Sequence, residues 1–347
     1  MIIININWLI YQHNIKPSIV IIYGKNKEII SLFLISTMNY FLAIFIFCMV
    51  LFLYLHIYYH LKTSSDLEVY TIEQPSKNKL EEICDLRQPV VFDFLNDRLL
   101  KSCNLETIDD NYGAFDIKLR DIKQVDANSE LYLPFLFKET IKLFQKDTES
   151  KYITENNKEF LQETGLIKNF KYNDAFLRPS MVAKCKYDIW SGSIKSQTPL
   201  RYNLEYRTFI YLTSGKAKIK LIPPHSGKYL NVEKDYDNFE FMSLLNPWNV
   251  QEEYKAEFDK VKVLDLDVNK GEIIFIPAYW WYSIEYEQLS SICVFKYHTY
   301  MSFISILPEI IMSLLQKQNI KREIANKINT NIAETTIDTK TNLKENE

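Results

Sequence analysis

The chain is poor in glycine and lacks the cysteine spacing of a metal site. Only 7 glycines occur among 347 residues, and the five cysteines, at positions 48, 84, 103, 185 and 293, form no Cys-x-x-Cys pair. We therefore expect ordinary buried thiols rather than zinc ligands. The scarcity of glycine accompanies heavy use of Ile, Asn, Lys and Tyr. An A/T-rich genome would produce that bias, so it indicates no structural class.

An excess of positive charge is also missing, as are acceptor sites for N-glycosylation. Lys and Arg number 41 against 44 Asp and Glu, and the net charge of −3 gives no general attraction to nucleic acid. No Asn-x-Ser/Thr triplet occurs, which leaves open the side of a membrane on which a domain would lie. The length allows one large domain or two small ones with ample apolar core.

One long apolar run stands near the N-terminus. No Asp, Glu, Lys or Arg occurs between Glu28 and Lys62. About 20 apolar residues cross the hydrocarbon core of a membrane, so residues 32–60 are predicted to form one transmembrane helix, near Phe33–Tyr58. A buried core helix or a cleaved signal peptide is the alternative. The run exceeds the roughly 7 to 15 apolar residues of a signal peptide, and no small-residue cleavage pattern follows.

The orientation of this span depends on the N-terminal segment, residues 1–31. Three lysines precede the span: Lys16, Lys25 and Lys27. By the positive-inside rule they slightly favour a cytosolic N-terminus with the large domain on the far side. Translation from Met38 would remove these lysines, so both the start and the orientation stay open.

Short strand patterns and helical segments follow the span. Residues 61–86 are polar and charged and are predicted to be a linker or short helix, while Leu131–Gln145 and Glu155–Ile167 are predicted helices. Lysines alternate with apolar residues from Lys216 to Ile222, which indicates a half-buried strand ending at two prolines. Residues 301–332 are predicted to form C-terminal helices, and residues 333–347 a disordered tail.

The run Gly271–Ile284 is the most informative segment. A turn glycine, four apolar residues, a proline and the pair Trp280-Trp281 describe a buried strand that enters a tight corner. With the Leu-Ile-Pro-Pro hairpin end and the Thr198-Pro199-Leu200 approach, it resembles the JmjC-like cupins. This family of Fe(II)/2-oxoglutarate dioxygenases includes asparaginyl hydroxylases. The resemblance covers Arg87 to Tyr300.

The resemblance implies a mainly β domain with flanking helices over residues 87–300, a double-stranded β-helix or jelly roll, behind the transmembrane helix. In the resembling family the helices after the barrel often pair two subunits, so residues 301–332 suggest a homodimer. An iron site there needs two His and one carboxylate. The family's His-x-Asp/Glu falls on Arg201 and Asn203, and its second His falls on Tyr282.

None of these three side chains keeps the family's ligand chemistry. Shifting the register by one residue places Tyr202 and Leu204 at the first two positions, which restores no His-x-acid pair. A guanidinium repels a cation, and a phenol with a pKa of about 10 is a poor Fe(II) ligand at neutral pH. We therefore expect no metal, no cofactor and no catalytic residue.

Other side chains could still serve the inherited pocket. His225 and His298 are lone histidines, which are more often surface or core residues than ligands. Lys216, Lys218 and Lys220 alternate in the manner of a solvated strand face. With Arg201, four residues are candidate contacts for a small anion: Arg207, Tyr211, Lys218 and Trp280.

These observations favour a membrane-anchored, metal-free cupin-like protein that acts as a non-catalytic binding or scaffold module. Its ligand would be an unknown protein or a small anion. One alternative is an Fe(II)/2-oxoglutarate-dependent protein hydroxylase with an unusual ligand set. A third hypothesis is a metal-independent enzyme that uses Tyr282, Arg201 and Glu205, although no spacing demands it.

Overall fold

A computed structural model describes residues 17–123 and 131–319, with side chains for residues 38–123 and 131–318. The chain divides into two compact units, of which the first ends at Leu61 and the second begins at Lys62. The expected tail at 333–347, the first 16 residues, and the C-terminal helices beyond residue 319 lie outside the described residues.

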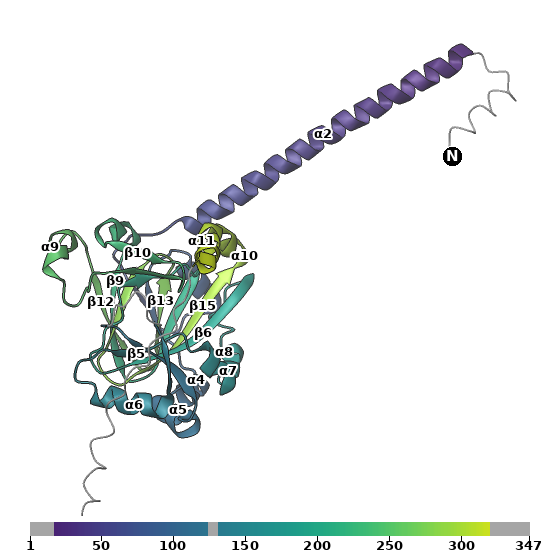
Figure 1. The fold of residues 1–347 in the computed structure, drawn as a ribbon. Helices are drawn as coiled ribbons and strands as arrows, with labels where there is room; N and C mark the ends of the chain where they lie inside the picture. The colour runs from purple at the N-terminus through teal and green to yellow at the C-terminus, as the bar shows by residue number, and fades with distance from the viewer. Residues whose placement is uncertain (1–16, 124–130, 320–347) are drawn as a thin grey trace, which may run out of the picture. The chain divides into compact units, whose positions relative to one another are not determined.

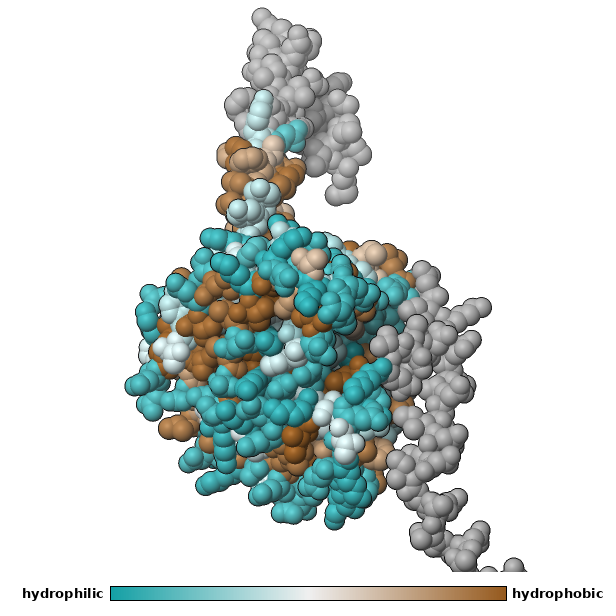
Figure 2. Space-filling model, turned by 90° about the vertical axis from the view of Figure 1, so that its left-hand side faces the viewer, coloured by the Kyte–Doolittle hydropathy of each residue, from teal (hydrophilic) through white to brown (hydrophobic). Residues whose placement is uncertain are grey.

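The described part of the first unit is a single helix, α2 (Pro17–Leu61). Its segment Met38–Leu61 spans 24 residues and is long and apolar enough to cross a membrane. The described side chains of this helix appear mostly brown, or apolar, in Figure 2. The expected N-terminal apolar helix is thus confirmed. It starts well before residue 32, because Lys and Glu favour helices and do not interrupt one.

Strands of the second unit form two sheets, which the ribbon in Figure 1 displays as stacked layers. The larger sheet has the order β1 (Tyr70–Ile72), β2 (Val90–Asp93), β13 (Glu272–Pro277), β8 (Arg207–Ser214), β15 (Ser291–Thr299), β6 (Val182–Gly192), β5 (Tyr152–Thr154), β3 (Asp116–Asp121), β4 (Leu133–Leu136). The smaller has the order β10 (Val232–Asp235), β11 (Glu240–Ser243), β7 (Arg201–Tyr202), β14 (Trp281–Tyr286), β9 (Lys216–Ile222), β12 (Leu264–Asn269).

Helices flank these sheets. They are α3 (Lys77–Cys84), α4 (Asp97–Ser102), α5 (Leu105–Tyr112), α6 (Phe137–Lys146), α7 (Lys158–Glu163), α8 (Ile167–Asn173), the 3-10 helix η1 (Pro224–Tyr229), α9 (Glu252–Phe258), α10 (Tyr300–Ser305) and α11 (Leu307–Asn319). In Figure 1, α10 and α11 lie at one end of the sheets, and α5 and α6 at the other. The predicted mainly β architecture with flanking helices is confirmed.

Three segments differ from the sequence-based expectations. The polar segment 61–86 is not a free linker, because β1 pairs in parallel with β2 and Leu80 of α3 is buried in the core. The helix expected from Leu131 begins only at Phe137, after β4 has paired with β3. The helix expected over Glu155–Ile167 is divided into α7 and α8. Gly165, at φ +74°, lies between them in a conformation that ends a helix.

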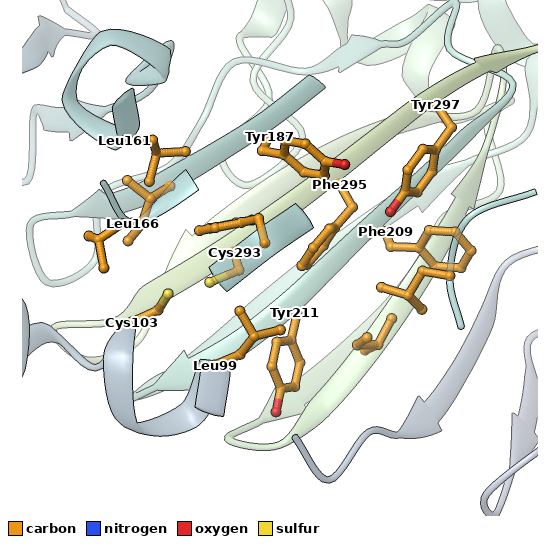
Figure 3. Close-up of a cluster of buried hydrophobic side chains, with 14 of the residues drawn as sticks. Leu99, Cys103, Leu161, Leu166, Tyr187, Phe209, Tyr211, Cys293, Phe295 and Tyr297 are labelled. Atoms are coloured by element: carbon orange, nitrogen blue, oxygen red, sulfur yellow. The ribbon is translucent and has the colours of Figure 1, made fainter. Parts of the chain in front are cut away.

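The two faces of the larger sheet contact different apolar clusters. On the outer face of the larger sheet, Phe209, Cys293 and Phe295 pack against Leu99 of α4 and Leu161 of α7 (Figure 3). The inner faces of the two sheets share another cluster, in which Ile210 and Val294 of the larger sheet meet Ile219 and Ile284 of the smaller. Alternate residues of β8 therefore serve two cores, which explains why every residue of this strand is buried.

The turn between β8 and β9 requires Gly215. Its φ of +79° is a conformation that L side chains rarely adopt, and a Cβ there would meet the Ser290 hydroxyl and, at 2.6 Å, the Leu289 carbonyl oxygen. Gly165 has a similar φ of +74° but open space around it. Substitution of Gly165 therefore tests backbone strain alone, whereas substitution of Gly215 adds steric conflict with neighbouring atoms.

We expect Gly215→Ala to lower the free energy of unfolding by more than about 2 kcal/mol, since crowding adds to the strain of a positive φ. Gly165→Ala should cost only about 1 kcal/mol, from strain alone. Chemical denaturation of the full chain in detergent, followed by circular dichroism, measures both. Equal losses for the two variants would contradict the steric role of the Ser290 region.

Candidate functional site

Strands β7 and β14 bring the substituted ligand positions together inside the barrel. In the antiparallel register Arg201 lies directly opposite Tyr282, and residues directly opposite each other project from the same face of a sheet. Tyr282 is buried in the inner cluster with Trp190 and Ile284. Tyr202, between the two inward positions, projects to the other face and packs edge-on against Trp281 at 4.7 Å between ring centroids.

The guanidinium of Arg201 is neutralised inside the barrel by a carboxylate from the other sheet. Arg201 Nη1 lies 2.5 Å from Glu155 Oε2, and the side chains are only 8% and 3% exposed. Its Cζ also lies 5.1 Å from the centre of the Trp190 ring and 5.6 Å from that of Tyr282. Burial opposes the charge, but Glu155 and other acidic neighbours outweigh it and raise the pKa of Arg201 well above its usual value.

Asn203 links the third position to the other two. Its Oδ1 accepts a hydrogen bond from the Tyr282 hydroxyl at 3.2 Å and a long one from Lys296 Nζ at 3.5 Å. Its Nδ2 donates to the Thr208 hydroxyl at 3.4 Å. Arg201, Asn203 and Tyr282 therefore form one connected group, in which Tyr282 contacts both of the others.

A second charged group continues this interior. Lys186 Nζ lies 2.8 Å from Glu205 Oε1, and His298 Nε2 lies 3.9 Å from the same oxygen. Burial would raise the pKa of Glu205, but Lys186, Lys296 and His298 together hold it well below its usual value. Burial lowers the pKa of His298 to about 4, so this imidazole is neutral at pH 7.

A third buried pair lies close enough to act electrostatically on the first. Arg120 Nη1 lies 3.0 Å from Glu240 Oε2, and the Tyr132 hydroxyl donates to Glu240 Oε1 at 2.8 Å. Glu240 also acts on the pKa of Arg201, and Glu155 on that of Arg120. Each buried arginine of these networks thus has its own carboxylate, and the interior is close to charge neutrality.

Several buried polar atoms of this interior have no hydrogen-bond partner among the described residues. They are Arg201 Nε and Nη2, Glu155 Oε1, Arg120 Nε and Tyr286 Oη. Buried donors and acceptors normally find partners, so these are the atoms whose hydrogen bonding the described side chains leave incomplete. The Arg201 guanidinium offers two such donors on one group.

The other residues predicted to contact a pocket lie elsewhere. Arg207 projects from the outer face of the larger sheet and binds Glu81 and Asp85 at 2.8 and 3.2 Å. Tyr211, on the same outer face in Figure 3, donates to the Phe94 carbonyl at 2.8 Å. Lys218 lies on the solvated face of β9, 2.8 Å from Glu287. These three residues therefore do not line the interior with Arg201, because strand alternation directs them outward.

The remaining candidate residues from the sequence are Trp280 and the two lone histidines, His225 and His298. Trp280 is fully buried in the inner cluster, and its Nε1 donates to the Arg87 carbonyl at 3.1 Å. His225 is exposed on η1, whereas His298 is buried on β15 beside Glu205. Among the described residues, no three His, Cys, Asp or Glu side chains gather closely enough to hold a metal ion. The donor set at the family positions does not fit Fe(II).

Sequence reasoning missed Glu155, because it placed this residue in a helix. The residue directly follows β5, which pairs with β6 at the edge of the barrel core, and that position directs its carboxylate inward. The signal available in the sequence was the run Tyr152-Ile153-Thr154, whose aromatic and β-branched residues favour a short strand that ends just before Glu155.

Comparison with known proteins agrees with this fold. A family model described as a cupin-like domain matches residues 76–302. HSPB1-associated protein 1 of Rattus norvegicus and of Bos taurus each share 22% identity with this chain over 98 residues. That segment covers 28% of this chain and only 20% of either relative.

We expect Arg201→Met to lower the free energy of unfolding by roughly 3 to 5 kcal/mol, because it leaves the Glu155 carboxylate buried without a partner. Glu155→Gln added to this variant should recover most of the loss. Lys218→Met is the matched control, since its exposed pair with Glu287 is worth at most about 1 kcal/mol. Urea unfolding of the full chain in detergent compares them. If Arg201→Met costs no more than Lys218→Met, the buried pair is not needed for stability.

Proposed function

This chain belongs to the cupin-like domain family, and from that membership we propose that it is a membrane-anchored, non-catalytic member that binds no Fe(II). The observation that carries the proposal is the contact of Tyr282 with both Arg201 and Asn203, at the positions that the resemblance assigns to the family's metal ligands. A cation entering this group would meet a guanidinium already paired with Glu155. It would find no imidazole and no free carboxylate there.

The same interior supports a binding role. Arg201 presents two unpartnered N–H donors in a buried site, close to the Tyr282 ring. Charged donors in a low-dielectric interior bind acceptor oxygens strongly, so a small molecule with a carboxylate or similar polar group is the ligand class that this site suits. The neighbouring carboxylates limit its net attraction for anions. We therefore propose a small ligand whose acceptor contacts Arg201 and whose donor contacts Glu155 Oε1.

The anchor is the second part of the proposal. Met38–Leu61 is supported as a span by its length and composition, and nearly all of its side chains are exposed rather than packed in a core. The domain beginning at Lys62 would then be held at a membrane surface. A scaffold or ligand-binding module is the role that this arrangement favours over a freely diffusing enzyme.

The alternative of an Fe(II)/2-oxoglutarate protein hydroxylase is tested by metal binding. We expect the full chain in detergent to bind less than one equivalent of Co(II), used as a surrogate for Fe(II). We also expect 2-oxoglutarate to leave its melting temperature unchanged when the metal is present. Calorimetric titration and thermal unfolding measure these two quantities. One equivalent bound, with stabilisation by 2-oxoglutarate, would establish the hydroxylase alternative instead.

A positive control restores the family's ligands in the same chain. It combines R201H, N203D and Y282H with Glu155→Gln, which removes the carboxylate that would otherwise lose its partner. Metal binding by this variant, but not by the natural chain, assigns the difference to the three positions.

The anchor is tested by alkaline carbonate extraction of membranes that contain the full chain. We expect the protein to remain in the membrane pellet, because a spanning helix is not displaced by high pH. A variant with Leu42→Arg and Phe45→Arg is the control, since two charges in the middle of the run should weaken insertion. Release of the natural chain into the supernatant would refute the anchor.

A further inference from the structure

The two C-terminal helices bury serines and expose apolar side chains. On α10 and α11, Ser302, Ser305 and Ser313 are buried, at 3 to 7% exposure. Seven large side chains are exposed instead: Tyr300, Ile304, Leu307, Ile311, Met312, Leu314 and Leu315. A helix that covers a core in water has the opposite pattern. We call the seven side chains the outer apolar face.

Two of the three buried serines have hydrogen-bond partners within the chain. Ser302 donates to the Thr299 carbonyl at 3.1 Å and its hydroxyl accepts from the Thr299 amide, while Ser305 donates to the Ser302 carbonyl at 2.7 Å. These short side chains allow the helices to lie close to the barrel. The helices are thus packed on the barrel through these serines, and their large apolar side chains still face outward.

Aromatic residues with polar ends lie beside the inner side of α11. Ile306 and Ile310 pack against a cluster that includes Phe241 and the partly buried Tyr202, Tyr236, Phe239 and Tyr279. Ile306 and Ile310 therefore attach the two helices to the barrel, and they are distinct from the seven side chains of the outer apolar face.

The segment that leaves the span is fixed to this same end. Lys62 directly follows Leu61, and its carbonyl accepts a hydrogen bond from Arg87 Nη1 at 2.5 Å. The Arg87 carbonyl in turn accepts from Trp280 Nε1, next to Tyr279. Burial raises the pKa of Tyr279 to about 12, and Glu309 of α11 and Arg87 are close enough to act on it. A chain of neighbours therefore connects Lys62 to α11.

The connection after Lys62 has little freedom. Gln88 Nε2 donates to Asp66 Oδ2 at 2.9 Å, and β1 joins the larger sheet from Tyr70. The segment from Lys62 to Ile72 is therefore bound to the domain that follows it and is not a long free linker.

We propose that the outer apolar face of α10 and α11 rests in the interfacial layer of the membrane that α2 spans, so that the domain contacts lipid directly. The inference rests on the proposed anchor. The occupant is the lipid surface, because Lys62, the residue that follows the span, is bound to this end of the domain, and helices with one apolar face bind such surfaces. Contact with lipid removes the exposed apolar side chains from water.

The test places a photoreactive residue on this face. The full chain, with Met312 replaced by p-benzoylphenylalanine, is reconstituted into phosphatidylcholine vesicles that contain an alkyne-bearing phosphatidylcholine. After illumination, lipid adducts are detected by coupling a fluorophore to the alkyne. The matched control carries the same residue at Tyr172 of α8, which is 75% exposed and lies on the helix-covered side of the larger sheet. We expect several-fold more lipid adduct at position 312 than at 172.

Two results would overturn the inference. One is a covalent dimer at position 312 without lipid adduct, which would assign the face to a second copy of the chain. The other is equal adduct at both positions. Carbonate extraction of the same vesicles separates these failures from failure of the anchor. Protein retained in the pellet without adduct at 312 contradicts only the lipid contact, whereas protein released to the supernatant contradicts the anchor as well.

Discussion

The ion pair between Arg201 and Glu155 is the constraint around which the interior of this barrel is arranged. A guanidinium at a position facing the core must be neutralised, because an unpaired charge in a low-dielectric interior is far more costly than any single apolar contact is favourable. Arg201 comes from the smaller sheet, and Glu155 follows a short strand of the larger one. Their pairing therefore joins the two sheets, and the rings of Trp190 and Tyr282 pack around it.

The remaining interior charges follow the same rule. Glu205 is balanced by Lys186 and Lys296, and Glu240 by Arg120. Because these carboxylates are already engaged, a divalent cation would have to displace an existing partner to gain a ligand. The hydrogen bond from Tyr282 to Asn203 occupies two of the family's ligand positions with each other. The charges of this interior are thus paired with one another.

The outside of the domain has a complementary asymmetry. Most exposed strand faces carry lysines paired with acidic residues, as Lys218 is with Glu287, and such pairs suit water. The C-terminal helices instead direct Ile311, Leu314 and their neighbours outward. The fixed connection at Lys62 lies within a short chain of contacts of these helices. The paired charges of the interior and the outer apolar face are independent features of the domain.

Local patterns in the sequence determined a large part of this picture. The apolar helix, the period-two strand β9 and the Pro277 corner before β14 are each set by neighbouring residues, so they could be recognised without the fold. The mutual proximity of Arg201, Asn203 and Tyr282 followed from the family resemblance. Only the tertiary structure decided the partner of Arg201, because Glu155 reaches it through sheet pairing between distant segments. The tertiary structure also decided that Arg207 and Tyr211 face outward. Every residue of β8 is buried, so the sequence of this strand does not indicate which side chains enter the inner cluster and which the outer one.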